Sequence, residues 1–303
     1  MISPHGPMLS RVFRLVALPL SASLACAPVS EAARECQIVQ PSTALAGGLA
    51  ESSGVAASRE HTGILWTHND SGNEAELSAV RASGERVAAV RLRGVRMTDW
   101  EDLSLAPCES GSCLYVADIG DGDGRRREIA ILRVPEPDPS AATEAVAERF
   151  PARYPDGPRD AEAMFILPSG EIHLVTKGRT GGVEIFRYPL PLRAGETVTL
   201  EPVRTLAAGQ QPLDQQVTGA SASPSGDWVA IRTYKTLQLW RTADLLGGEG
   251  TPHLVVDLGP LGEPQGEAVA LLDDGTVVVT SEGGFPGAVG SVAVLRCQLT
   301  IDS

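Results

Sequence analysis

Residues Glu267–Glu282 read EAVALLDDGTVVVTSE: an apolar run, a turn that contains Gly275, and a second apolar run that ends in polar residues. Two short apolar runs joined by a glycine turn are typical of a β-hairpin. The same module occurs five times along the chain, at Ser53–Asp70, Glu101–Asp118, Glu162–Lys177, Thr218–Thr233 and Glu267–Glu282. The leading polar residue precedes the turn glycine by eight residues in the last three copies and by ten in the first two. This regularity predicts a repeat architecture.

The spacing of the modules indicates the kind of repeat. Successive copies begin 48 to 61 residues apart, and short strands rich in Val, Ile and Leu follow each copy. Such units fit four-stranded propeller blades. We therefore predict an all-β fold, a β-propeller with five four-stranded blades, and keep a β-sandwich as the alternative. A sixth blade is also considered, between Ala141 and Arg159.

The fifth copy ends after its third strand, Ser291–Leu299, and lacks a partner. We expect Glu35–Gln40 at the other end of the chain to supply the fourth strand and to close the ring. Closure matters because an open propeller exposes strand edges that pair with other chains.

Setting Cys26 aside leaves four cysteines, which allow three pairings. Cys108 and Cys113 flank a short loop with Gly111, so a local bridge between them is geometrically easy. The two remaining cysteines, Cys36 and Cys297, would then pair with each other, which agrees with ring closure by the N-terminal strand. Free buried thiols are the alternative.

The N-terminal 32 residues have the order of a secretory signal. Arg11 and Arg14 precede an apolar run from Leu15 to Leu24, which is too short to span a membrane. Either a lipoprotein signal ends before Cys26, with a lipid anchor on that cysteine, or an ordinary signal is cleaved after Ala32. We expect residues 1–32 to be a signal segment and residues 35–303 to form a single propeller domain of an exported, extracellular or cell-envelope protein.

The charge composition limits the classes of binding partner. The chain of 303 residues has 25 Lys and Arg against 38 Asp and Glu, a formal net charge of -13. This sign disfavours nucleic acid and anionic membrane surfaces as partners. We expect a monomer that binds a small-molecule or envelope ligand, with contact to a membrane only through a lipid on Cys26.

The residues that lead the five modules should line the central channel near one face, because the first strand of a propeller blade is the innermost. These residues are Ser53, Glu101, Glu162, Thr218 and Glu267. Converging carboxylates repel one another unless a cation or a shared proton neutralises them. Oxygen ligands suit a hard cation. The sequence therefore predicts a metal site, with Ca²⁺ as the expected ion; hydrogen bonds that cap the strand ends are the alternative.

A second polar ring is expected where the second strand of each module ends. It holds Asp70, Asp118, Lys177, Thr233 and Glu282, with Asn69 and Arg232 beside it. We predict that Lys177, Arg232, Glu282 and Asn69 contact a ligand. Asp70, Asp118 and His68 are the candidates for an acid or base, and Tyr234 for stacking. Solvated surface loops are the alternative reading of these positions.

Several motifs together resemble a family of largely uncharacterised bacterial exported β-propeller proteins with lipoprotein-like signals. They are Glu51–Gly54, Trp66–Gly72, Asp99–Asp102, Tyr115–Asp121, Tyr154–Ala163 and Glu263–Ala268. The resemblance implies an extracytoplasmic propeller. More remotely, the polar ring is similar to that of calcium-activated nucleotidases, five-bladed propellers that hold Ca²⁺ on the axis, and the blade pattern is similar to that of phytase-like esterase propellers.

Two functional hypotheses follow. The first is a cell-envelope protein that binds a ligand at an axial, cation-holding site, because propellers often only bind. The second is a metal-dependent hydrolase of phosphate or other esters. The sequence lacks a Gly-x-Ser-x-Gly elbow, a Walker lysine loop and a dinucleotide fingerprint after a strand, which excludes a serine hydrolase of that type, a nucleotide-driven motor and a Rossmann enzyme. Whether the protein is an enzyme stays open.

Overall fold

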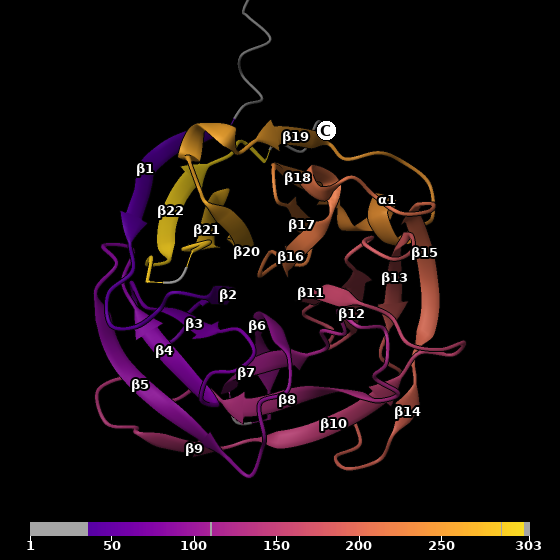
Figure 1. Ribbon diagram of the computed structural model, residues 1–303, viewed down its shortest axis with the longest axis horizontal. Coiled ribbons are helices and arrows are strands. Elements are labelled where there is room, and N and C mark those ends of the chain that lie inside the picture. The colour runs from indigo at the N-terminus through magenta and orange to yellow at the C-terminus, as the bar shows by residue number, and fades with distance from the viewer. Residues whose placement is uncertain (1–35, 110, 286, 300–303) are drawn as a thin grey trace, which may run out of the picture. The chain divides into compact units, whose positions relative to one another are not determined.

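The computed structural model describes residues 36–109, 111–285 and 287–299. These residues form twenty-two strands, which are arranged in five sheets around a common axis (Figure 1). The all-β fold and the five-bladed propeller are confirmed, and the β-sandwich is excluded. The expected signal segment, including Cys26, lies outside the described residues.

Each sheet is one blade, and its strands follow one another from the axis outwards. Blade 1 contains β2 (Ser52–Ala57), β3 (Leu65–Asn69), β4 (Glu76–Val80), β5 (Arg86–Arg93) and β9 (Glu144–Val146). Blade 2 contains β6 (Trp100–Cys108), β7 (Gly111–Asp118), β8 (Ile129–Pro135), β10 (Glu148–Arg153) and β14 (Val198–Thr199). Blade 3 contains β11 (Ala161–Ile166), β12 (Ile172–Thr176), β13 (Val183–Arg187) and β15 (Glu201–Ala207).

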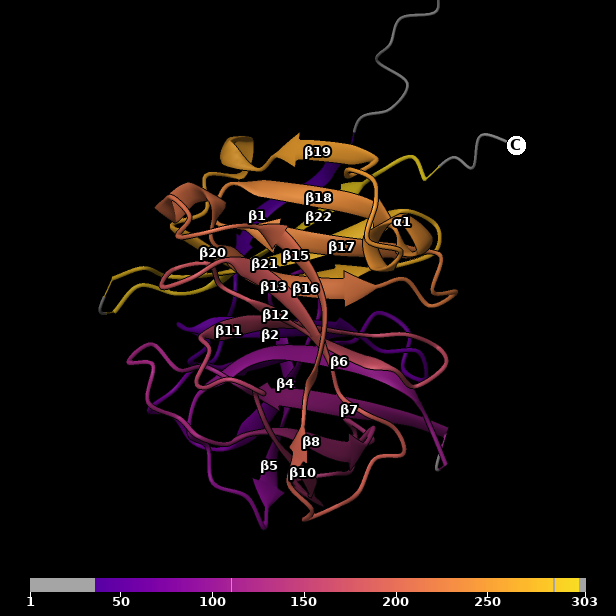
Figure 2. The same ribbon diagram turned by 90° about the vertical axis from the view of Figure 1, so that its right-hand side faces the viewer.

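Blade 4 contains β16 (Val217–Ala222), β17 (Trp228–Thr233), β18 (Thr236–Arg241) and β19 (Leu254–Asp257). Figure 2 shows these four strands side by side, from β19 at the rim to β16 near the axis. Blade 5 contains β20 (Gln265–Leu271), β21 (Thr276–Glu282), β22 (Ser291–Arg296) and β1 (Gln37–Ala44). The described helices are short: α1 (Thr242–Leu246) and two 3₁₀ turns, Leu213–Gln215 and Gly259–Leu261.

The ring closes as the sequence predicts. Strand β1 pairs antiparallel with β22, so that Gln37 faces Arg296 and Ala44 faces Ser291. A disulfide joins Cys36 to Cys297 at the start of this pair, and a second one joins Cys108 to Cys113. The innermost strands β2, β6, β11, β16 and β20 contact one another in a closed cycle. Both predicted pairings are therefore confirmed.

The segment between Ala141 and Arg159 is not a sixth blade. Its first strand, β9, crosses over and pairs in parallel with β5 of blade 1, with Arg91 facing Glu144. Its second strand, β10, is the fourth strand of blade 2. In the same way β14, from the sequence of blade 3, pairs in parallel with β10. These two exchanges join neighbouring blades at the outer edge of the ring.

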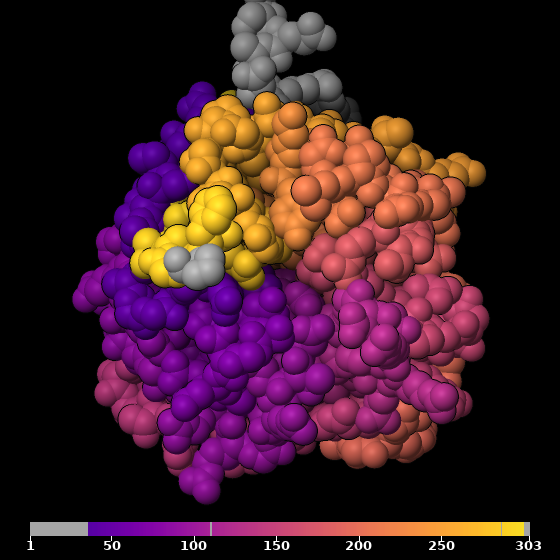
Figure 3. Space-filling model, in the orientation of Figure 1, coloured from indigo at the N-terminus to yellow at the C-terminus, as the bar shows by residue number. Residues whose placement is uncertain are grey.

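The core is divided into five apolar clusters, one between each pair of neighbouring blades. Tyr115 and Phe150 of blade 2, for example, pack with Met164 and Phe186 of blade 3. Because inner strands are buried on both faces, their sequences are apolar almost throughout instead of alternating. Figure 3 shows the blades following one another around this face in the order of the sequence. Among the described residues, no helix is long and apolar enough to span a membrane.

Candidate functional site

The ends of the inner strands surround an acidic cavity of about 180 Å³ on the axis of the propeller. Four of the five leading polar residues line it: Ser53, Glu101, Glu162 and Glu267. Thr218 does not. The other lining residues are Asp70, Asp99, Gly122, Lys177, Arg179, Tyr234, Gln265 and Glu282. We call this space the axial cavity.

A repeated backbone irregularity explains why these side chains converge. In every blade the pairing of the first and second strands slips next to the leading polar residue, for example between Ser52 and Gly54 and between Trp100 and Asp102. The same slip occurs at Glu162, Thr218 and Glu267. A β-bulge leaves one residue unpaired and re-aims its side chain. The bulges therefore turn one polar residue per blade away from the apolar interfaces between blades.

The two hydroxyl-bearing residues of this ring connect neighbouring blades. Ser53 Oγ donates a hydrogen bond to the carbonyl oxygen of Glu101 at 3.0 Å. Thr218 Oγ1 donates one to the carbonyl oxygen of Glu267 at 2.8 Å. Thr218 lies outside the cavity lining. Its hydrogen bond therefore fits the alternative prediction, in which the leading residues cap strand ends instead of binding a metal.

Among the described residues, three carboxylates of the cavity are grouped closely enough to hold one metal ion: Asp70, Asp99 and Glu101. One oxygen from each of them lies within 4.8 Å of the others. Asp70 directly follows β3, and Asp99 directly precedes β6, so two neighbouring blades supply the group. We call these three residues the acidic trio. Their oxygen atoms form a donor set that suits a hard divalent cation.

Gly120 makes room for the acidic trio. A Cβ atom at this position would lie 1.9 Å from Glu101 Oε1 and 2.6 Å from Asp99 Oδ2. A side chain would therefore displace both carboxylates. The backbone at Gly122 approaches Arg179 in a similar way, with 2.6 Å between a Cβ and Nη2.

The two cations of the axial cavity are already paired with carboxylates. Lys177 Nζ lies 2.9 Å from Glu162 Oε1, and Arg179 Nη2 lies 3.0 Å from Asp160 Oδ2. Six carboxylates line the same cavity, and five of them have no ion pair with a described residue: Asp70, Asp99, Glu101, Glu267 and Glu282. The cavity is therefore short of positive charge.

Burial and mutual repulsion raise the pKa values of these carboxylates. Burial comes first for Glu101, whose pKa rises well above its usual range, and the charges of Glu162 and Asp70 add to it. Burial and the nearby Glu162 and Glu282 raise the pKa of Glu267 in the same way. The pKa of Glu162 rises to about 7 through burial, although Lys177 opposes this. The pKa of Glu282 also rises to about 7, through burial and the charge of Asp70.

Gln265 bridges two of the acids. Its amide Nε2 donates hydrogen bonds to Glu267 Oε1 at 2.8 Å and to Glu282 Oε2 at 2.7 Å. Tyr234 borders the cavity next to Lys177, whose ammonium group lies 5.7 Å from the centre of the ring. Burial raises the pKa of Tyr234, so its hydroxyl stays protonated.

Arg232 is not at the cavity, contrary to the prediction. Its side chain is fully buried between blades 4 and 5, where Nη1 donates to the carbonyl oxygens of Ala268 and Thr280 at 3.0 and 3.1 Å and Nη2 pairs with Glu263. A Cβ at Gly266 would lie 1.7 Å from Nη2. The sequence pattern could not show this, because Arg232 precedes the end of its strand by one residue and points into the interface.

Three other predicted residues have structural partners outside the cavity. Asn69 donates from Nδ2 to the carbonyl oxygen of Gly48. Asp118 pairs with Arg126 at 2.9 Å and accepts a hydrogen bond from the backbone N–H of Asp99. His68 is fully buried against Trp100, and burial lowers its pKa. Of the proposed acids and bases, the structure places only Asp70 in the lining of the axial cavity.

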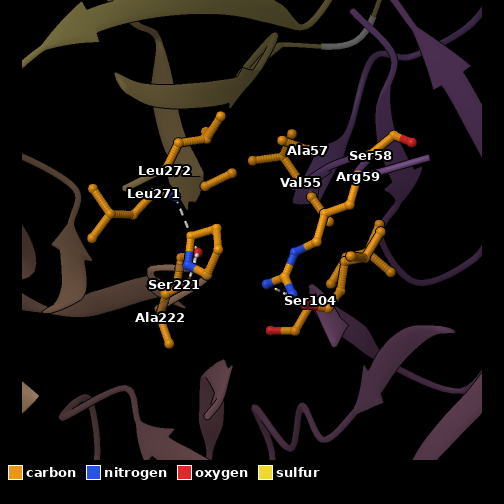
Figure 4. A pocket seen from close by; sticks show the side chains of 14 residues that line it. Val55, Ala57, Ser58, Arg59, Ser104, Ser221, Ala222, Leu271 and Leu272 are labelled. Carbon is orange, nitrogen blue, oxygen red and sulfur yellow. Dashed lines mark hydrogen bonds between the residues drawn. The ribbon is translucent and has the colours of Figure 1, made fainter. Parts of the chain in front are cut away.

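Asp102, the neighbour of Glu101 in β6, is fully buried among the inner strands. Its carboxylate accepts hydrogen bonds from the backbone N–H groups of Leu103, Met164 and Ala220, at 2.8, 2.8 and 3.1 Å. One side chain thereby connects the inner strands of blades 2, 3 and 4. A smaller pocket of about 60 Å³ opens on the axis at the other ends of the inner strands, and Arg59 extends into it (Figure 4). The axial cavity is thus acidic, whereas the smaller pocket contains the positive charge of Arg59.

Sequence reasoning missed Asp99, Arg179 and Gln265 as site residues. Asp99 is two residues before Glu101 and lies outside the repeated module. Arg179 and Gln265 also fall outside the five aligned copies. Asp99 and Gln265 do lie within motifs that carry the family resemblance, Asp99–Asp102 and Glu263–Ala268, and this was the available signal.

No family model matches this sequence, and no curated protein matches it either. The structure is similar to the PQQ-bound aldose sugar dehydrogenase of Streptomyces coelicolor, with a TM-score of 0.52, 10% identity, and coverage of 87% of this chain and 98% of that one. It is also similar to a gluconolactonase of Xanthomonas campestris (TM-score 0.46, 11% identity, 88% and 92% covered). A third similar structure is the calcium-binding protein regucalcin of Agrobacterium tumefaciens (TM-score 0.43, 14% identity, 86% and 96% covered). At 10% identity, the likeness to the aldose sugar dehydrogenase supports the propeller fold alone, and the resemblance to one particular family stays a prediction.

Proposed function

We propose that this chain is an exported β-propeller of the cell envelope that binds a divalent cation, Ca²⁺, at the acidic trio and a small-molecule or envelope ligand beside it. The observation that carries the proposal is the convergence of Asp70, Asp99 and Glu101 in a cavity whose two cations are paired with other carboxylates. Without a cation, this arrangement places the partly exposed Asp70 and Asp99 and the buried Glu101, three like charges, side by side.

The acidic trio fits Ca²⁺ better than a softer metal. Its donors are carboxylate oxygens, whereas zinc sites use mostly nitrogen and sulfur. Ca²⁺ takes six to eight oxygen ligands, so three carboxylates leave coordination positions for a ligand. Relative to the predicted metal ligands, this assignment keeps Glu101 and adds Asp70 and Asp99. Glu162 is committed to Lys177, and Glu267 to Gln265.

The disulfides support the proposed compartment. Both bridges need an oxidising environment, which agrees with export through a signal segment at residues 1–32. A lipid on Cys26 would tether the propeller to a membrane. The acidic cavity and the net charge of -13 disfavour nucleic acid as a partner. We propose a monomer, because β1 closes the ring within one chain.

The alternative is a metal-dependent hydrolase of phosphate or other esters. A divalent cation supplies Lewis-acid activation of water or of the ester. Glu282 supports this alternative, since its pKa of about 7 lets it hold or release a proton near neutral pH within the same cavity. The test is release of phosphate or of 4-nitrophenol from 4-nitrophenyl esters, with Glu282→Gln as the variant.

The experiment for the leading proposal is a thermal melt with Ca²⁺, with Mg²⁺ and with a chelator. Binding to the folded state alone raises the melting temperature. We expect a calcium-dependent rise in the unmodified protein that is lost in Asp99→Asn. Glu249→Gln is the matched control, because it also removes one negative charge, at an exposed position away from the cavity.

Two outcomes decide between the hypotheses. A calcium-dependent rise without ester turnover supports a binding protein, and turnover that needs the metal and disappears in Asp99→Asn supports the hydrolase. Equal melting temperatures in calcium and in chelator would overturn the cation site.

A further inference from the structure

A second, larger space adjoins the axial cavity. It has a volume of about 490 Å³, within the range of sites for small organic molecules. Tyr234 and Gln265 line both spaces, so they form the boundary between them. We call this second space the side groove. A ligand that reaches the acidic trio from the side groove would pass along the ring of Tyr234.

The side groove contains a buried acceptor that lacks a partner. The side chain of Glu263 is 5% exposed and lines the groove. Its Oε2 pairs with the buried Arg232, whereas its Oε1 has no hydrogen-bond partner among the described residues. A buried polar atom without a partner is costly. A ligand donor that reaches this oxygen would satisfy it.

The rest of the groove is partly apolar. Leu213 is 69% exposed at its rim, and Pro264 and the ring of Tyr234 add further carbon surface. An exposed leucine, a proline and an aromatic ring offer a surface for the C–H face of a ring-shaped ligand. Asp214 and Lys235 contribute one negative and one positive charge. These two residues therefore leave the net negative charge of the site unchanged.

The charges argue against an anionic ligand. Lys177 and Arg179 are paired with Glu162 and Asp160, so the axial cavity offers no unpaired cation among its described residues. Its walls consist mainly of hydrogen-bond acceptors, namely the carboxylates of Glu267, Glu282 and the acidic trio. This lining favours a ligand that supplies hydrogen-bond donors and brings no negative charge of its own.

We propose that the axial cavity and the side groove together bind an uncharged, polyhydroxylated ring. Neighbouring hydroxyls of the ring complete the coordination of the cation, another hydroxyl donates to Glu263 Oε1, and the C–H face lies on Tyr234. This inference rests on the proposed cation site for the first contact only. The chemistry is shared by a free monosaccharide or cyclitol and by the terminal residue of an envelope polysaccharide.

The experiment measures binding by isothermal titration calorimetry and by saturation-transfer NMR, in calcium and in chelator. The free-ring probes are myo-inositol, glucose, galactose and N-acetylglucosamine, and the terminal-residue probes are maltotriose and chitotriose. Cyclohexanol is the matched ring with a single hydroxyl. We expect at least one polyol to bind in calcium and cyclohexanol not to bind. Tighter binding of a trisaccharide than of its monosaccharide identifies a polymer as the source.

Two variants locate the binding site. Tyr234→Leu should weaken polyol binding by about fivefold, since it removes the aromatic face. Leu213→Ser should weaken it by about threefold through lost apolar contact. Because Leu213 is exposed, this substitution should leave the fold intact. Val146→Ser is the matched control, because Val146 is 71% exposed on β9 of blade 1 and should leave binding unchanged.

The two proposals fail in different ways. A calcium-dependent melt without binding of any polyol would overturn the ligand class and leave the cation site standing. Polyol binding that is equal in calcium and in chelator would overturn the cation contact. Polyol binding that Leu213→Ser and Tyr234→Leu leave unchanged would remove the side groove from the site.

Discussion

The ammonium group of Lys177 lies 2.9 Å from the carboxylate of Glu162, and both residues belong to blade 3. One blade therefore supplies a cation together with its counter-charge. The carboxylates that blades 1, 2 and 5 add to the axial cavity form no such ion pair with the described residues. This imbalance determines how the protein should respond to pH, to metal ions and to mutation.

The first prediction concerns pH. The pKa values of Glu162 and Glu282 are raised from 4.5 to about 7 in the folded protein. Between pH 4.5 and about 7, the folded state therefore binds more protons than the unfolded state. The free energy of unfolding should fall as the pH rises through this range. Urea unfolding in chelator at pH 5, 6, 7 and 8 measures this directly.

Glu282→Gln should flatten this pH dependence, because the amide does not titrate, whereas Glu249→Gln should leave its slope unchanged. Added Ca²⁺ should restore stability mainly at the higher pH, where the carboxylates are ionised. A stability that increases from pH 5 to pH 8 in chelator would contradict the prediction.

The second prediction concerns Asp102, which accepts three backbone hydrogen bonds on the axis. Asp102→Ala leaves these donors unsatisfied in a fully buried position and should lower the free energy of unfolding by about 3–5 kcal/mol. Asp102→Asn keeps one acceptor oxygen and should lose less. Urea denaturation gives both values, with the exposed Asp227→Ala as the control. A loss below about 1 kcal/mol would show that the blades do not depend on this connection.

The third prediction concerns Gly120. Its backbone does not have a positive φ, so Gly120→Ala causes no conformational strain, but the new Cβ would collide with the oxygens of Glu101 and Asp99. We expect calcium affinity to fall by about tenfold while the urea midpoint in chelator changes little. Gly181→Ala is the control, because a Cβ there meets no atom within 4 Å. Unchanged calcium affinity would exclude Glu101 and Asp99 as ligands.

The fourth prediction concerns Arg232. Arg232→Met removes a buried guanidinium and leaves Glu263 as an unpaired buried charge. The free energy of unfolding should fall by about 3–5 kcal/mol. The double variant Arg232→Met/Glu263→Gln should recover part of this loss, because the charge disappears with its partner. If the double variant is no more stable than the single one, the ion pair is not the reason for the loss.

The fifth prediction compares the disulfides. Cys36–Cys297 closes a loop of 261 residues and Cys108–Cys113 one of 5. In the chain-entropy account, opening the long loop costs about 6 kcal/mol and opening the short one about 2 kcal/mol. Calorimetry of Cys36→Ser/Cys297→Ser and of Cys108→Ser/Cys113→Ser tests the order. Equal losses would mean that β1 holds the ring closed without the covalent bond.

Much of the fold was predictable because a propeller repeats one local unit. The glycine turn and the apolar runs of Glu267–Glu282 recur five times, and each copy forms the inner hairpin of a blade. The incomplete fifth copy and the positions of Cys36 and Cys297 together predicted the closing strand β1. Local periodicity and loop counting were sufficient here. The exchanges through β9 and β14 were not predictable, since parallel pairing between blades leaves no local signal.

The sequence by itself determined the five blades, their closure and the four polar residues that line the axial cavity. The tertiary structure decided which of these residues are available to a ligand. Lys177 and Glu162 are separated in the sequence, so their ion pair is visible only in the folded structure. Arg232, which resembled a ligand contact, is enclosed between two blades, and Asp99, which lay outside the repeat, joins the acidic trio. The reason is physical: a repeat determines where each side chain leaves the backbone, but which charged groups come together depends on how the strands are folded, within a blade for Lys177 and Glu162 and between blades for Arg232 and Glu263.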